Sequence, residues 1–463
     1  MKRIIFVLLL FFGFAAQAQD GLVARYDRRT ELVSIVYRLA DRQEYSQCYF
    51  AQYASDVDRH FASFKNHAAV LMAQKMADRV TYDAPMAFAH RLLWNDTIAL
   101  NSNLADDNDY YYLRWNRQEE QTFVMLLNQF AKESHFDEFY QAHRDLYSQA
   151  EQALQALLNV VDMDWFDSYF EPRDNVRYTA TPSLLNGPEN YSYTAHTLDG
   201  GSHLSLTLGC CFPDKNGTPA FNANTQLPII IHEVCHSYCN PLDNQHWKSL
   251  SRPAGKVYLA YQQQMERQAY PSPFIMMNET FVRACVIRYF ELHFNQYQPD
   301  GPLMDEVGYG FVLTPTVLEC LRRRDMNKFP TMNAYMPTLC KEVRSFSLKR
   351  FLQEQAEMDR QRPHVLDCQM PTEAGEGRIV IVFDKPMGDK VAVYNGNTGD
   401  PFPTLSSRQP PVEWSPDHTT LTIYVNLESG KSYAFGVEKG FRSADGRPLS
   451  EAKYYSFKVN SEL

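Results

Sequence analysis

The sequence predicts an α+β protein in which a mostly helical domain with a small β-sheet precedes a separate all-β sandwich. Apolar residues recur at helical spacing across residues 28–170, most clearly within 56–80, 116–134 and 135–170. From residue 175 the pattern alternates, and after Pro363 short alternating segments are separated by turn residues. These changes of period predict three parts, which are a helical lobe at 28–170, a mixed part at 175–350 and a sandwich at 364–463.

The first eighteen residues have the character of a secretory signal peptide. Lys2 and Arg3 precede an apolar run at 4–14, and Ala16-Gln17-Ala18 offers a small-residue cleavage site. We therefore expect an exported protein, periplasmic or extracellular, whose first mature domain spans 19–363. The apolar run is too short to span a bilayer, and no later segment reaches the roughly twenty apolar residues that a transmembrane anchor needs.

Composition restricts the partners of the chain. A net charge of −10 over 463 residues argues against nucleic acid as a partner. Nine cysteines are an odd number, so at least one is unpaired within a single chain. Cys235 and Cys239 lie one helical turn apart, but no second cysteine pair has the spacing of a zinc finger or ribbon. We expect both to be small buried apolar residues rather than thiolate ligands.

The residues His232-Glu233-Val234-Cys235-His236 form the pattern H-E-x-x-H. Residues four apart lie on one face of a helix, so both imidazoles can bind the same zinc ion. Glu233 follows the first histidine and is placed to act as a general base. The pattern predicts a metal site with His232 and His236 as ligands and Glu233 as the catalytic base. The alternative is a pair of core histidines that hydrogen-bond to backbone.

Flanking residues predict where this helix begins and ends. Pro228 suits a first helical turn, with Asn224 or Thr225 as the cap. Asn240-Pro241 predicts the end, because proline disfavours helical geometry in the residue before it. Apolar residues around much of the intervening cylinder predict a buried helix, with the two histidines inside a cleft.

The third ligand is expected on a later helix. A third histidine in the pattern H-E-x-x-H-x-x-G-x-x-H is excluded, because Cys239 and Leu242 occupy the glycine and histidine positions. A second helix is predicted to begin at Ser272-Pro273, where a capping residue precedes proline. Glu279 lies on the apolar stripe of that helix. An unpaired carboxylate there would cost several kcal/mol, and metal ligation would remove this cost.

Other arrangements of the charged groups are open at this point. Glu279 can instead form an intrahelical ion pair with Arg283, four residues later. Asp243 and His246, just beyond the first helix, are weaker alternative ligands.

His232-Glu233-x-x-His236 followed by Asn278-Glu279 resembles the gluzincin metallopeptidases. Residues 30–350 are also similar to an uncharacterised family of exported bacterial proteins with a gluzincin-like core, a domain of unknown function. The resemblance implies Zn²⁺ held by His232, His236 and Glu279, with Glu233 as base. The substrate does not follow from the resemblance, and we expect a peptide or protein. The stretches that carry it are 31–36, 44–45, 82–85, 232–241 and 278–284.

One position departs from the better-known gluzincins. Their glutamate helix often carries an acidic residue one turn later that orients a ligand histidine, and here that residue is Arg283. Ligand histidines need a partner for their second ring nitrogen, so a different residue must orient them.

Strand patterns at 191–197 and 203–208, joined by a turn at 198–201, predict a β-hairpin before the metal helix. In peptidases with this core such a strand lies beside the cleft, where its edge can pair with an extended substrate. His196 and His203 lie on the hairpin, either as solvated strand residues or as groups that stabilise an oxyanion. Tyr289 and Tyr309 are further candidates for the oxyanion donor.

Residues after Pro363 predict a β-sandwich with strands around 378–387, 414–423, 433–435 and 445–449. Their order is similar to the bacterial immunoglobulin-like modules of exported and surface-layer proteins, over residues 366–463. The resemblance implies either contact with a cell surface or polymer, or a module that presents the catalytic domain.

Together these patterns predict a secreted zinc-dependent hydrolase, and the peptidase reading is the leading one. Two alternatives remain from the sequence. One is a catalytically silent exported protein that binds metal or a surface polymer, and the other is a structural exported protein without metal.

Overall fold

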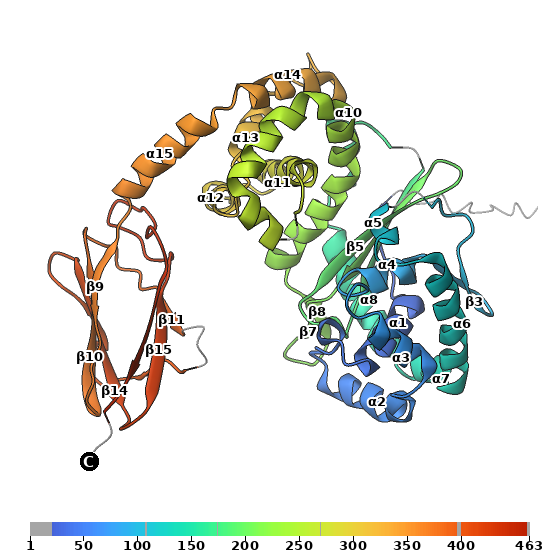
Figure 1. Cartoon of the computed structure of the whole chain (residues 1–463), viewed down its shortest axis with the longest axis horizontal. Coiled ribbons are helices and arrows are strands. Elements are labelled where there is room, and N and C mark those ends of the chain that lie inside the picture. Colours follow the sequence, from blue (N-terminus) through green and yellow to red (C-terminus); the bar gives the residue numbers. More distant parts are fainter. Residues whose placement is uncertain (1–20, 107–108, 174, 269, 396–399, 461–463) are drawn as a thin grey trace, which may run out of the picture. The chain divides into compact units, whose positions relative to one another are not determined.

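The computed structural model describes residues 21–460 except 107–108, 174, 269 and 396–399. The predicted signal peptide at 1–18 lies outside the described residues. The chain divides into two compact units, the first ending at Phe346 and the second beginning at Ser347. The architecture is mixed α+β, as predicted, with antiparallel sheets in the second unit (Figure 1).

The N-terminal lobe of the first unit is mostly helical, as predicted. The predicted helical range 116–134 is a single helix, whereas 56–80 and 135–170 are each interrupted. His67 caps a new helix by accepting a hydrogen bond from the Ala69 N–H, and His135 has a positive φ of 52°. The elements are α1 (Arg28–Leu39), η1 (Gln43–Tyr45), α2 (Ala51–Phe61), η2 (Ala62–Phe64), α3 (Ala68–Lys75), α4 (Ala84–His90), β2 (Leu92–Trp94), β3 (Ile98–Leu100), α5 (Asp109–Tyr112), α6 (Arg117–Glu133), α7 (Phe136–Ala142), α8 (Arg144–Leu158) and α9 (Met163–Tyr169).

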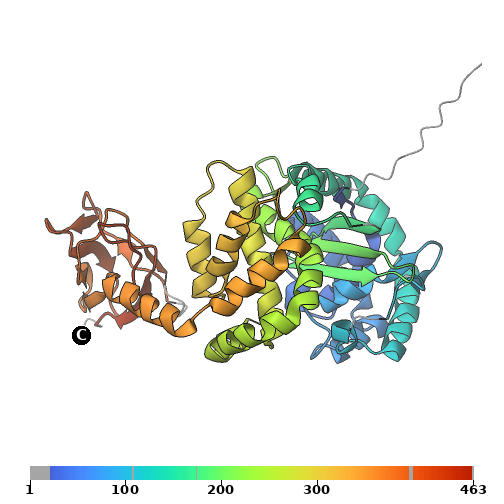
Figure 2. The same cartoon turned by 90° about the horizontal axis from the view of Figure 1, so that it is seen from above.

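A four-stranded sheet separates this lobe from the helices that follow. Its order is β1-β4-β6-β5, with strands β1 (Val23–Ala24), β4 (Val176–Pro182), β5 (Asn190–His196) and β6 (Ser202–Leu208). Strands β5 and β6 are antiparallel, with Tyr193 opposite Ser205, which confirms the predicted hairpin. Helices α4 and α8 contact the sheet, and these green strands lie beside the blue helices in both views (Figures 1 and 2). A short hairpin, β7 (Cys211–Pro213) and β8 (Pro219–Phe221), follows.

The metal helix is α10 (Ala223–Arg267), and both of its predicted ends are wrong. Asn222 is the cap, so Pro228 lies in the second turn rather than the first. The helix also continues through Pro241 and Pro253. The local preference against helix before proline is outweighed by packing, because α10 lies against α11 and α14 along its length.

Four further helices complete the first unit. The prediction for α11 is confirmed, since the Ser272 side chain accepts a hydrogen bond from the Ile275 N–H and Pro273 is the first helical residue. Its long contact with α10 brings residues near position 279 beside the H-E-x-x-H turn. These helices are α11 (Pro273–His293), α12 (Asp300–Gly308), α13 (Thr314–Arg323) and α14 (Met332–Ser345).

The second unit contains one helix and two antiparallel sheets that share a hydrophobic core. One sheet has the order β12-β14-β10-β9 with β13 also paired to β14, and the other has the order β11-β15-β16. The predicted strand at 445–449 is instead a turn, with Gly446 at φ 85°. The elements are α15 (Leu348–Gln361), β9 (Val365–Gln369), β10 (Gly375–Phe383), β11 (Val393–Asn395), β12 (Thr404–Leu405), β13 (Val412–Trp414), β14 (Thr420–Leu427), β15 (Ser432–Val437) and β16 (Lys453–Lys458).

The helices and the cysteines of the described residues can be compared with the sequence predictions of no transmembrane anchor and of buried, apolar Cys235 and Cys239. Within the part of the chain that the structure describes, no helix combines the length and the apolar character needed to cross a membrane. All nine cysteines are free, and Cys235 and Cys239 are buried in the core between α10 and its neighbours.

Candidate metal centre

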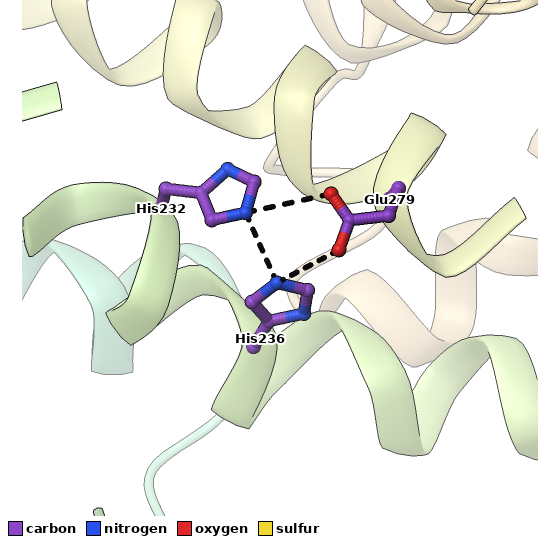
Figure 3. A group of neighbouring side chains, drawn as sticks. All are labelled: His232, His236 and Glu279. Atoms are coloured by element: carbon purple, nitrogen blue, oxygen red, sulfur yellow. Dashed lines mark hydrogen bonds and ion pairs between the residues drawn. The ribbon is translucent and has the colours of Figure 1, made fainter. Parts of the chain in front are cut away.

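His232, His236 and Glu279 converge on one point between α10 and α11 (Figure 3). The two histidine Nε2 atoms are 3.1 Å apart. The Glu279 carboxylate faces both, with Oε2 at 3.5 Å from His232 Nε2 and Oε1 at 3.3 Å from His236 Nε2. In the described residues this is the one group of three or more His, Cys, Asp or Glu side chains whose ligand atoms lie within 4.8 Å of one another.

The donor set fits a tetrahedral zinc ion. Bonds of about 2.0–2.1 Å hold the ligand atoms of a tetrahedral site about 3.3 Å apart. The two histidine nitrogens are 3.1 Å apart, and each lies 3.3 or 3.5 Å from one of the two Glu279 carboxylate oxygens, which is close to that separation. Two imidazole nitrogens and a carboxylate are also a donor set that zinc accepts in catalytic sites, where three protein ligands leave a fourth position open. Glu279 Oε2 is buried and lacks a hydrogen-bond donor among the described residues, so it has a free acceptor for an ion.

Asn240 orients one of the histidines. Its Oδ1 lies 3.2 Å from His236 Nδ1, one turn further along α10. An amide oxygen only accepts, so this contact places a proton on Nδ1 and, in the neutral ring, leaves the Nε2 lone pair free for a ligand role. Asn240 therefore supplies the orienting partner that the sequence leaves unassigned.

Arg283 connects Glu279 to a second carboxylate. Its Nε is 3.3 Å from Glu279 Oε2, and its guanidinium also donates to Glu306 Oε2 at 2.7 Å and to the Tyr270 hydroxyl at 3.0 Å. The guanidinium carbon of Arg283 lies 4.1 Å from the centre of the Phe311 ring. The positive charge of Arg283 is therefore also stabilised by a cation–π contact with the face of this ring. The guanidinium contacts the same carboxylate oxygen, Glu279 Oε2, that faces His232.

Burial and charge set the protonation of the three groups. Burial opposes ionisation of Glu279, but the two histidines and Arg283 lower its pKa to about 2. Burial likewise opposes a charge on His236, but hydrogen bonding to Glu279 raises its pKa to about 9. Burial lowers the pKa of His232. Without a metal, the site therefore holds one proton, on His236, at neutral pH.

A pocket of about 670 Å³ adjoins the triad, and His232 and Glu233 are among its lining residues. Glu233 is half-buried on α10, next to the first histidine. The carboxylate predicted to act as a base therefore faces a space that a substrate can enter.

The alternative ligands do not join the triad. Asp243 is fully buried among the helices, near Cys285 and Cys340, and it is not part of the group of converging ligands. His246 pairs through Nε2 with Asn333 Oδ1 at 3.2 Å. Both of these weaker alternatives are therefore wrong for the site as folded.

The four residues considered as oxyanion donors lie elsewhere. His203 Nε2 bonds to Thr179 Oγ1 at 2.9 Å, and His196 is exposed at the end of β5. Tyr289 is buried in an aromatic core, where its hydroxyl accepts a hydrogen bond from the Asp162 N–H at 2.8 Å. Tyr309 is 52% exposed after α12. None of the four has a hydrogen bond or ion pair with the triad among the described residues.

Several residues around the site were missed from the sequence, among them Asn240, Tyr270 and Glu306. Asn240 lies four residues after His236, so helical spacing alone would have found it. Tyr270 lies in the connection between α10 and α11, and no local pattern relates it to the site.

A comparison with known protein families identifies the family of this chain. Residues 22–342 match the family described as "Domain of unknown function (DUF4932)". The chain belongs to the DUF4932 family. The DUF4932 match includes the positions of all four predicted site residues and confirms the predicted resemblance to an uncharacterised domain family, over residues 22–342 where the sequence predicts 30–350.

No curated protein matches the sequence of this DUF4932 chain significantly. Among solved structures it is similar to "Crystal structure of the S-layer protein rSbsC(31-844)", at 12% identity and a TM-score of 0.18. That match covers 89% of this chain and 46% of the other, so the chain spans less than half of that protein. A superposition with this score carries no structural argument.

Proposed function

We propose that the DUF4932 domain of this chain is a zinc-dependent peptidase with gluzincin-like ligands His232, His236 and Glu279. The observation that carries the proposal is the convergence of three side chains from two helices, with contacts of 3.1 to 3.5 Å between the two histidine nitrogens and the Glu279 carboxylate oxygens. In the metal-free site Arg283 and the proton on His236 balance the buried carboxylate of Glu279, and a metal ion would take the place of that proton. The adjoining pocket supplies room for a substrate at the same place.

The residues around the triad have defined parts in this proposal. A divalent zinc ion, when bound, would lower the pKa of a water molecule and polarise a peptide carbonyl. Glu233 accepts the proton of the attacking water and returns it to the leaving amine. Asn240 holds the tautomer and orientation of His236, and Arg283 holds the carboxylate of Glu279.

The second unit bears on where the proposed peptidase acts. We propose an immunoglobulin-like sandwich that presents the peptidase or contacts a cell surface or polymer, in a protein exported by its first eighteen residues. Two antiparallel sheets over one core support the sandwich reading. The finer fold assignments, zincin-like and immunoglobulin-like, rest on the sequence resemblance.

Metal analysis and one substitution test the peptidase. Purified full-length protein should hold about one zinc per chain, and Glu233→Gln should keep this zinc while lowering kcat about 10²- to 10⁴-fold. Glu266→Gln, an exposed glutamate on the same helix, is the matched control and should cleave normally. Less than half an equivalent of zinc, with chelator-insensitive activity, would refute the metal site.

A mixed peptide library decides between the peptidase and a catalytically silent protein. Wild-type protein loaded with zinc should cleave some members, with the pattern lost in Glu233→Gln. Full zinc occupancy without cleavage of any member would favour the silent metal-binding alternative.

A further inference from the structure

The pocket beside the triad is largely apolar. Its walls come from the first turns of α10, from α11, from the segment between α11 and α12, and from α12 itself. Apart from Asn224 and four groups of the site and its ion pair, every lining residue is apolar or aromatic. These are Ala223, Leu227, Pro228, Ile229, Val286, Ile287, Phe290, Phe294, Tyr297 and Pro302.

The pocket continues directly from the triad because both lie on the same stripes of two helices. On α11, Glu279, Arg283, Val286 and Phe290 follow one another at intervals of four, three and four residues, which is one face of a helix. On α10, Ile229 lies one turn before His232 and Glu233. A group in the pocket is therefore adjacent to the proposed base.

Apart from the proposed base Glu233, the charged groups of the lining, Arg283 and Glu306, are satisfied by each other and by their neighbours. Arg283 donates to Glu306 at 2.7 Å and also binds Glu279 and Tyr270. This network leaves neither Arg283 nor Glu306 as a free counter-ion for a charged ligand. At the far end, the Phe290 ring stacks on Phe294 at 5.1 Å and meets Tyr297 at 5.3 Å, which forms an aromatic wall.

We propose that this pocket binds a large apolar side chain, aromatic or branched aliphatic, of the substrate residue that flanks the scissile bond. The inference rests on the proposed peptidase function, because it places that residue next to Glu233. A side chain of this kind fills apolar volume and matches the aromatic wall, whereas an acidic one finds no free cationic partner and would lose its hydration.

Binding without turnover tests the pocket separately from the chemistry. Zinc-loaded Glu233→Gln protein is titrated by calorimetry with blocked hexapeptides Ala-Ala-Ala-Xaa-Ala-Ala, in which Xaa is Phe, Leu, Gly or Asp. The Phe and Leu peptides should bind about 10- to 100-fold more tightly than the Gly and Asp peptides, as expected for burial of a large apolar side chain. Equal affinities across the four peptides would overturn the inference.

Two substitutions at Val286, a half-buried lining residue, make the test specific. In the Glu233→Gln background, Val286→Trp should fill the pocket and remove the preference for Phe, and Val286→Lys should shift the preference toward Asp. Leu292→Trp is the matched control, since Leu292 is an exposed apolar residue of α11 outside the pocket, and it should leave the preference unchanged. Zinc content, measured for each variant, verifies that the site has folded.

The cleavage pattern of wild-type protein separates the two proposals. Cleavage beside Phe or Leu supports both. Zinc-dependent cleavage with no side-chain preference refutes the pocket inference and leaves the peptidase standing. Preferential binding of Phe without cleavage of any peptide supports the pocket and refutes the peptidase.

Discussion

Arg283 lies one turn beyond Glu279 on α11, and its Nε is 3.3 Å from Glu279 Oε2. The same carboxylate reaches His236 through its other oxygen, at 3.3 Å. The sequence poses an ion pair and a ligand role for Glu279 as alternatives, but in the folded chain one carboxylate contacts both partners. Arg283 is a positioning residue in this arrangement, because it forms an ion pair with Glu279 and is not itself a candidate metal ligand.

Replacing Arg283 with alanine should therefore weaken zinc binding about 10- to 100-fold, as is usual when the partner of a metal ligand is lost. The affinity can be measured by competition with a chromogenic chelator. Arg288→Ala is the matched control, because Arg288 lies on the same helix and pairs with Glu291 instead. If both variants bind zinc like wild type, Glu279 does not depend on this contact.

The centre of the site could be predicted because it depends on local geometry. Helical spacing brings His232 and His236 to one face, and a carboxylate at 279 on an apolar stripe needs a partner, so the sequence alone indicates all three. The ends of α10 could not be predicted from local preference, because the contacts of α10 with α11 and α14 compensate for Pro241 inside the helix. Tyr270 depends on where a connecting segment folds back, and no spacing encodes that.

Zinc binding should release about one proton at neutral pH. His236 has a pKa of about 9 in the metal-free site, whereas His232 is neutral and Glu279, with a pKa of about 2, is already ionised. The metal must displace the proton on His236, so the affinity should rise about tenfold per pH unit up to about pH 9. Calorimetry in buffers of different ionisation enthalpy counts the proton. Release of none, or of two, contradicts this assignment.

In the metal-free protein, the interaction between His236 and Glu279 should make the free energy of unfolding depend on pH. The raised pKa of His236 stabilises the fold fully below about pH 6.5, its ordinary value, and this contribution is lost as pH rises through about 9. The lowered pKa of Glu279 stabilises the fold above about pH 4.5 and is lost as pH falls through about 2. The pair contributes most between those ordinary values, and His236→Gln should flatten the profile of Tm against pH.

Separation of the two units should leave the metal site intact. The triad and its orienting residues all lie before Phe346, and the second unit has its own hydrophobic core. We expect residues 21–346 to bind one zinc with the affinity of the full chain, and residues 347–463 to unfold cooperatively on their own. A fragment 21–346 that is folded by circular dichroism but has lost zinc affinity would show that the second unit contributes to the site.

Asp243 should destabilise the first unit at neutral pH. It is 0% exposed, and neither carboxylate oxygen has a hydrogen-bond partner among the described residues. Burial raises its pKa well above the ordinary 3.8, so the folded chain keeps a proton that the unfolded chain releases. The free energy of unfolding therefore falls as pH rises above about 3.8, by about 1.4 kcal/mol per pH unit until the folded-state pKa is reached.

An asparagine side chain cannot ionise, so Asp243→Asn should remove the loss of stability that Asp243 causes above about pH 3.8. Urea unfolding of residues 21–346 at pH 4 and pH 7 should give similar stabilities for wild type and variant at pH 4, and a more stable variant at pH 7. Asp305→Asn, at an exposed position of α12, is the matched control and should change neither value by more than about 0.5 kcal/mol. Equal stabilities of Asp243→Asn and wild type at pH 7 would mean that Asp243 is ionised and compensated in the folded protein. A compensating cation would then have to lie among α10, α11 and α14, beside Cys285 and Cys340.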